Sequence, residues 1–125
     1  MIQYIAIGVG GMIGALGRYI ISIMLIGWEG FPYATLVVNL LGCFFLSFLL
    51  NHYSIKKKLS PKIHVALTTG IIGSFTTYST FAIETIELWQ INSYLAISYI
   101  LISVLGGLLS SYIGFNIASK GQVHL

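Results

Sequence analysis

Four long apolar stretches constrain this chain more than any other feature. They cover residues of about 2–26, 33–52, 63–88 and 94–118, and only short polar connections separate them. A helix needs about 20 apolar residues to cross a bilayer, so each stretch is long enough for one crossing. Charged residues make up only 7% of the chain, whereas soluble domains contain roughly 25%. We therefore predict an all-α membrane protein with four transmembrane helices in a single domain, residues 1–125.

The third stretch is interrupted in its middle by glycines and hydroxyl side chains. Gly70 and Gly73 precede a run of serines, threonines and aromatic residues that ends at Phe81. Non-helical backbone at membrane depth is tolerated only inside protein or beside a watery cavity, so such a break indicates an ion or substrate site near the bilayer midplane. Alternatively, the glycines only allow close packing and the threonines bond to their own helix. The pattern alone leaves both interpretations open.

Two polar residues lie deep in the first two stretches. Arg18 either extends to the membrane interface or faces protein and stabilises an anion. Asn39 shares one helical face with Thr35, and an amide without a partner in hydrocarbon is costly. Its two N–H donors suit either a neighbouring helix or a bare anion.

Small residues mark the first and fourth stretches. Gly10 and Gly14 form a Gly-x-x-x-Gly pair, which lets another helix approach to backbone contact. In the fourth stretch Ser103, Gly107 and Ser111 recur at helical spacing. These patterns predict two tightly packed helices.

The charged residues predict how the chain is oriented. Four crossings place five of the six basic residues on the side of both termini, namely Lys56, Lys57, Lys58, Lys62 and Lys120. The other side has one basic residue, Arg18, and the three acidic residues Glu29, Glu84 and Glu87. The positive-inside rule then predicts that both termini are cytoplasmic in the cell membrane. Trp28, beside Glu29, is predicted as an interfacial aromatic residue.

The polar residues argue against an enzyme and favour passive transport. The chain has no aspartate, and no histidine, cysteine or carboxylate pair has metal-ligand spacing. Three of the four stretches contain no carboxylate, although a proton-coupled transporter normally needs one inside a span. The remaining candidates for an ion pathway are neutral donors that can replace the hydration shell of a small anion, namely Asn39, Thr76, Thr77, Ser79, Thr80 and Ser111. Because the basic residues lie beside spans, no nucleic-acid partner is expected.

Three glycine- and hydroxyl-rich motifs follow one another along the chain. They are GGMIGALGRY at residues 10–19, TLVVNLLG at 35–42 and GIIGSFTTYSTF at 70–81, and Glu84 follows the third. Together they resemble the Fluc or CrcB family of small microbial fluoride channels. The resemblance implies a passive fluoride-selective channel that exports cytoplasmic fluoride and confers fluoride resistance.

The resemblance also implies an assembly and a set of site residues. Two inverted chains would pack as an antiparallel dimer of dual topology with two fluoride pathways, and the third helix would be broken near the midplane. A sodium ion at the dimer centre would be held by the backbone carbonyls of Gly73 and Thr76. Asn39 would donate to fluoride, and the rings of Tyr78 and Phe81 would line each pathway. The family's track of hydroxyls is matched by Ser79, Thr80 and Ser111.

Two departures from the family pattern affect the site. Tyr78 stands where the family usually has phenylalanine, and Ala34 stands where a glycine is common. The tyrosine hydroxyl either adds a donor to the pathway or crowds it, and the sequence favours neither.

Alternative partners and functions also follow from the sequence. The bias of five basic residues against one favours insertion in one orientation, so the inverted partner is either a second copy or a paralogous chain. In the second case the chain would conduct only with its paralogue. A proton-coupled small-molecule exporter can share the size and inverted dimer, but it would need a carboxylate in the first span. A non-conducting packing subunit is expected only if Asn39 and the hydroxyl cluster face neighbouring helices.

Overall fold

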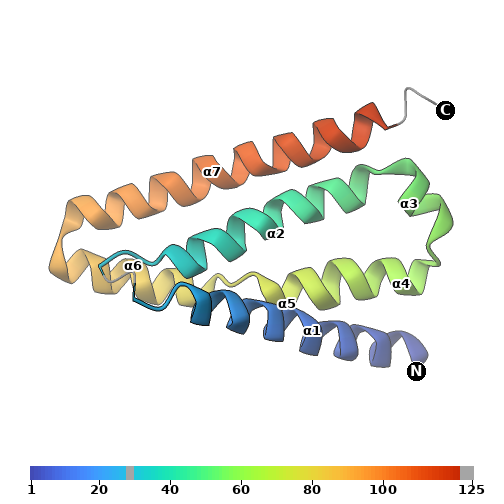
Figure 1. Ribbon diagram of the computed structural model, residues 1–125, viewed down its shortest axis with the longest axis horizontal. Coiled ribbons are helices and arrows are strands. Elements are labelled where there is room, and N and C mark those ends of the chain that lie inside the picture. Colours follow the sequence, from blue (N-terminus) through green and yellow to red (C-terminus); the bar gives the residue numbers. More distant parts are fainter. Residues whose placement is uncertain (28–29, 122–125) are drawn as a thin grey trace.

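The computed structural model describes residues 1–27 and 30–121, which form helices and short connections without a strand. Three helices are long and apolar enough to cross a membrane: α1 (Ile2–Met24), α2 (Tyr33–Asn51) and α7 (Ser93–Lys120). The start of α1 and the end of α7 lie at the same end of the molecule (Figure 1). The prediction of an all-α, multi-pass membrane protein is thus confirmed. Trp28 and Glu29, predicted as an interfacial aromatic and part of the acidic side, lie outside the described residues.

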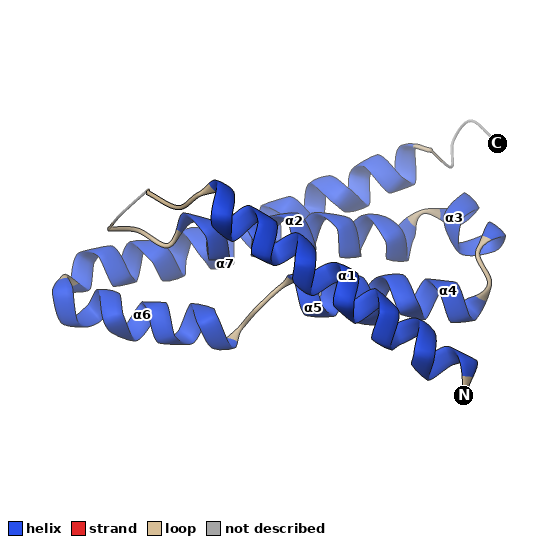
Figure 2. Ribbon diagram, turned by 60° about the horizontal axis from the view of Figure 1, so that its bottom comes forward, coloured by secondary structure: helices blue, strands red, loops and turns tan. Residues whose placement is uncertain are grey.

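The third apolar stretch is divided into several pieces, and a short helix, α3 (Tyr53–Lys58), precedes it in the lysine-rich connection. The pieces are α4 (Pro61–Val65), the π-helical η1 (Ala66–Ile72), α5 (Gly73–Phe75) and α6 (Ser79–Ile91). An extended connection joins α5 to α6 (Figure 2), and Thr76 at its start has an extended backbone with φ −79° and ψ 158°. With 13 residues, α6 is about 20 Å long, too short to cross a hydrocarbon core of about 30 Å alone.

Local capping explains where two of the connections fall. Ser60 accepts the N–H of Ile63 through its hydroxyl oxygen at 3.4 Å, and Pro61 occupies the first turn of α4. Asn92 accepts the N–H of Tyr94 at 2.9 Å and so begins α7 directly after α6 ends. Because this turn is short, α6 and α7 form an antiparallel hairpin.

Glycines allow the helices to approach to backbone contact. A Cβ atom at Gly10 would lie 2.6 Å from the carbonyl oxygen of Ala66, and one at Gly70 would lie 2.7 Å from that of Ile7. Likewise, a Cβ atom at Gly14 would collide with the backbone of η1. The partner of the Gly-x-x-x-Gly pair is therefore the π-helical segment ahead of the break.

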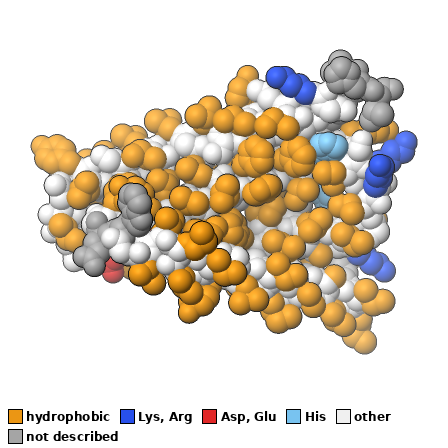
Figure 3. All heavy atoms as spheres, in the orientation of Figure 1, with side chains coloured by type: hydrophobic (Ala, Val, Ile, Leu, Met, Phe, Trp, Pro, Cys, Tyr) orange, Lys and Arg blue, Asp and Glu red, His pale blue; other side chains and the backbone are white. Residues whose placement is uncertain are grey.

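The outer surface is mostly hydrophobic. Figure 3 shows apolar side chains over most of the visible face, with basic side chains at the end where the helical termini lie and an acidic one at the opposite end. The fully buried core is small and centres on Leu88, Ala96 and Tyr99. Exposure of this kind is expected for a surface that contacts lipid or another chain.

Candidate functional site

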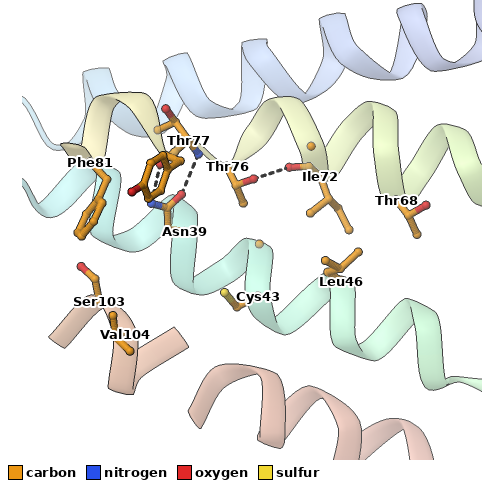
Figure 4. A pocket seen from close by; sticks show the side chains of 13 residues that line it. Asn39, Cys43, Leu46, Thr68, Ile72, Thr76, Thr77, Phe81, Ser103 and Val104 are labelled. Atoms are coloured by element: carbon orange, nitrogen blue, oxygen red, sulfur yellow. Dashed lines mark hydrogen bonds between the residues drawn. The ribbon is translucent and has the colours of Figure 1, made fainter. Parts of the chain in front are cut away.

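The break between α5 and α6 is held by a side chain of α2. Asn39 donates through Nδ2 to the carbonyl oxygen of Thr77 at 2.9 Å, and its Oδ1 accepts the N–H of Thr77 at 2.9 Å (Figure 4). Thr77 is buried, so these bonds satisfy backbone groups that would otherwise be left without partners inside the protein. The sequence left open whether Asn39 contacts a neighbouring helix or an anion, and in the structure it contacts the segment between α5 and α6. The amide has a second N–H that these two bonds do not use.

Two backbone carbonyls lose their helical partners at the break. In a continuous α-helix the N–H of Thr77 would bond the carbonyl of Gly73, but it donates to Asn39 instead. Similarly, the N–H of Thr80 would bond the carbonyl of Thr76, but it donates to the hydroxyl oxygen of Thr77 at 3.2 Å. Backbone carbonyls released in this way are typical ligands of Na⁺ at broken membrane helices. The oxygen donors at Gly73 and Thr76 therefore fit the sodium ion that the resemblance implies.

A cavity of about 430 Å³ lies beside the break. Asn39, Tyr78 and Phe81 belong to its wall, and Ser103 enters from α7 (Figure 4). The ring centroids of Tyr78 and Phe81 are 6.1 Å apart, and Tyr78 is 81% exposed. The two predicted pathway rings thus lie together, beside the amide that was predicted to donate to the ion.

Ser103 is a wall residue that the sequence analysis did not assign to the pathway. Its hydroxyl oxygen is buried, and among the described residues it has no hydrogen-bond partner. The predicted Ser111 instead donates to the carbonyl oxygen of Cys43 at 3.4 Å and does not belong to this cavity wall. The sequence did contain a signal for Ser103. Phe81 and Ser103 each lie eleven residues from Asn92, the turn between α6 and α7, so an antiparallel hairpin places them at the same level.

A second, more polar cavity of about 290 Å³ reaches the break from the side of α1. Its wall contains the guanidinium-bearing Arg18 together with Thr35, Thr77 and Thr80. Arg18 is half-buried, and Ser22 donates to its carbonyl oxygen at 3.0 Å. Of the two roles considered for Arg18, this placement favours the one facing protein.

Hydroxyl groups at the start of α6 are linked to one another. The Thr77 hydroxyl donates to that of Thr80 at 3.0 Å and lies 3.4 Å from that of Ser79. Thr77 lines both cavities, whereas Thr80 lines only the polar one. The structure therefore brings these three predicted residues together around Thr77, the residue that the two cavity walls share, although Ser79 itself lines neither cavity.

Glu84 is joined to two other helices by hydrogen bonds. Its carboxyl oxygens accept from the hydroxyl of Thr35 at 2.8 Å and from the hydroxyl of Tyr99 at 2.8 Å. Tyr99 is fully buried, and its ring packs on that of Phe81 with centroids 5.0 Å apart. The sequence analysis treated Glu84 only as a structural and topological marker and did not consider Tyr99. The available signal was the position of Tyr99 inside an apolar stretch, where its hydroxyl needs a hydrogen-bond partner.

These observations define a small multi-pass membrane protein with polar groups gathered at a broken helix between two cavities. Residues 5–115 match the family described as "CrcB-like protein, Camphor Resistance (CrcB)". The chain belongs to this family, which confirms the membership predicted from the three motifs.

Several relatives are similar over most of their length. The "Fluoride-specific ion channel FluC 1" of Desulfitobacterium hafniense (strain Y51) is 46% identical over 112 residues, covering 89% of this chain and 98% of the relative. The "Fluoride-specific ion channel FluC 2" of Listeria monocytogenes serotype 4b (strain F2365) is 42% identical over 118 residues, covering 94% and 91%. The protein named FluC 1 in Bacillus cereus (strain ATCC 14579) is 39% identical over 117 residues, covering 91% and 81%.

Proposed function

We propose that this chain is a subunit of a passive, fluoride-selective ion channel. The observation that supports this most directly is the clamped break, which places neutral N–H and O–H donors between two cavities in a protein similar to fluoride-specific channels. Such donors can replace the hydration of a small anion, and the wall of the 430 Å³ cavity contains no charged residue that would trap it there. Membership in a family of ion channels also agrees with the prediction that the chain is not an enzyme.

In this proposal the two cavities are successive parts of one pathway. The positive charge of Arg18 attracts the anion into the polar cavity, where the hydroxyl of Thr80 can donate to it. On the other side of Thr77, the unused N–H of Asn39 and the hydroxyl of Ser103 can donate, and the positive ring edge of Phe81 faces the ion. Successive weak donors let the ion leave as readily as it enters.

Besides α1, α2 and α7, we propose that residues 61–91 also cross the membrane, in two halves on either side of the break. We further propose that two inverted chains complete two pathways. The exposed ring of Tyr78 and the apolar outer surface support a covering partner. In such a dimer the carbonyls of Gly73 and Thr76 from both chains would hold Na⁺ at the centre. Its charge would balance the carbonyl dipoles exposed at the two breaks.

The inverted partner is a second copy or a paralogous chain. The relatives' names carry the numbers 1 and 2, which supports the existence of paralogues. The lysine bias supports cytoplasmic termini in the cell membrane for most copies. A reporter tag at the C-terminus distinguishes the cases, because equal populations on the two sides would contradict a fixed orientation and favour a homodimer.

The testing experiment is fluoride efflux from liposomes that contain only this purified chain, with chloride as the comparison ion. We expect fast fluoride efflux, little chloride efflux, and loss of fluoride efflux in Asn39→Asp and Phe81→Ile. Asn116→Asp is the matched control, since Asn116 belongs to neither cavity wall described above.

The outcomes separate the candidate functions. Equal efflux of chloride would contradict fluoride selectivity. Efflux that requires a proton gradient would favour the proton-coupled exporter. If a well-folded dimer of this chain gives no fluoride efflux, and efflux appears after co-reconstitution with a paralogue, the chain conducts only with that partner.

A further inference from the structure

The positive charge of the chain is concentrated at one end of the molecule. Exposed lysines occupy α3 and α4 there, and Lys120 ends α7 at the same end (Figures 1 and 3), the full set being Lys56, Lys57, Lys58, Lys62 and Lys120. Within residues 1–27 and 30–121, none of these lysines forms an ion pair with a carboxylate. Glu84 and Glu87 both lie on α6, away from this end. Among the residues that the structure describes, the lysine cluster therefore has no carboxylate partner.

An apolar cavity lies directly beside this lysine cluster. It has a volume of about 530 Å³ and lies between the end of α2, the loop helix α3 and the π-helical η1. Leu49, Ile55, Leu59 and Leu67 form most of its wall, and Lys58 belongs to the wall as well. A hydrophobic hollow with a basic side chain on its wall matches a molecule that has an apolar chain and an anionic head.

The helix that carries the lysines directly follows α2, one of the helices long enough to cross a membrane. His52, at the end of α2, accepts the N–H of Ile55 through Nδ1 at 3.3 Å and so caps α3. The ammonium group of Lys57 lies 5.6 Å from the ring centroid of Tyr53, which is itself exposed. Tyrosine rings are enriched at the headgroup level of bilayers. We therefore expect the lysines of α3 at the level of the lipid phosphates.

We propose that this end of the chain binds an anionic phospholipid. The lysine cluster contacts the phosphate and headgroup, and one acyl chain occupies the apolar cavity beside Lys58. Clusters of four or more basic residues immediately next to a membrane helix attract anionic headgroups, while long lysine side chains reach the headgroup region. The site is separate from the ion pathway and does not depend on what that pathway conducts.

The test is lipid retention by the purified full-length chain, counted by native mass spectrometry after exposure to equal amounts of phosphatidylglycerol and phosphatidylcholine. We expect at least tenfold preference for phosphatidylglycerol. The triple variant Lys56→Gln, Lys57→Gln, Lys58→Gln should lose that preference, since each lysine near an anionic surface contributes roughly fivefold. The matched triple arginine variant keeps the charge and should keep the preference.

Two further arms distinguish the source of the anion and guard against misfolding. Inorganic phosphate and glycerol phosphate should not displace phosphatidylglycerol, because they lack the acyl chain that the cavity holds. In the unmodified chain, raising the salt concentration should lower phosphatidylglycerol retention and leave phosphatidylcholine retention unchanged. Equal retention of the two lipids, an unaffected glutamine variant, or displacement by free phosphate would each overturn the proposal.

Discussion

Replacing Asn39 by leucine tests whether the α2 amide holds the break open. The substitution keeps the branched shape of the side chain but removes both 2.9 Å hydrogen bonds to the backbone of Thr77. Thr77 is only 8% exposed, so its N–H and C=O would lose their partners in the protein interior. We therefore expect the free energy of unfolding to fall and fluoride efflux to be lost.

The magnitude can be bounded from these two bonds. A buried backbone group left without a partner costs about 1–3 kcal/mol, so two such groups set an upper bound of about 6 kcal/mol. Side-chain hydrogen bonds within membranes average only about 0.6 kcal/mol, so two of them set a lower bound of about 1 kcal/mol. If the N–H of Thr77 returns to the carbonyl of Gly73, the loss lies near the lower bound.

The assay compares unfolding of the purified variant and the unmodified chain in the same detergent, followed by fluoride efflux from liposomes. Asn39→Asp should retain the acceptor for the N–H of Thr77 but oppose its carbonyl oxygen, so it should also be destabilised. Asn116→Leu in α7 is the control for removing an amide elsewhere. A loss below about 0.5 kcal/mol with normal efflux in Asn39→Leu would refute the clamp, because it lies below the average for two membrane hydrogen bonds.

Further predictions concern packing, the core and the cavity wall. Gly10→Ala should destabilise the chain by about 1–3 kcal/mol, because its Cβ would meet a backbone carbonyl oxygen of η1 at 2.6 Å. Gly11→Ala should be nearly neutral because nothing lies within 4 Å of its Cβ, and equal melting temperatures of the two variants would contradict this prediction. Tyr99→Phe removes a hydroxyl that donates to the α6 carboxylate and should cost about 1–3 kcal/mol in unfolding experiments, while Tyr112→Phe, at a residue 63% exposed, should cost little. Ser103→Ala should leave stability unchanged or raise it, because the buried hydroxyl lacks a partner, yet it should slow fluoride efflux; unchanged efflux would remove that residue from the pathway.

The class of fold and the position of the break could be predicted from the sequence. The lengths of the apolar stretches require helices, because unpaired backbone groups are costly in hydrocarbon. The glycines and hydroxyls between Gly70 and Phe81 indicate where the third stretch is interrupted, and the extended Thr76 lies among them. These features are local, so the order of residues along the chain is sufficient to reveal them.

The partners of the polar groups could not be predicted in the same way. Helical periodicity placed Thr35 and Asn39 on one face. It did not predict that Thr35 would contact Glu84 and that Asn39 would contact the break. It also placed Ser103 and Ser111 on one face, but the depth at which α7 passes the break decides that Ser103 lines the cavity. Periodicity defines a face of a helix, whereas contact also requires the register and crossing of its neighbour.

The sequence by itself therefore determined that this is a helical membrane protein of the CrcB-like family with an interrupted third apolar stretch. Only the tertiary structure decided that Asn39 clamps the interruption and that the carbonyls of Gly73 and Thr76 lose their helical partners. The physical reason is that a buried backbone N–H can leave its own helix at low cost only when another acceptor replaces the lost bond. For the N–H of Thr77 that acceptor is Asn39, 38 positions away, and only once it is in place does the nearby hydroxyl of Thr77 take the N–H of Thr80.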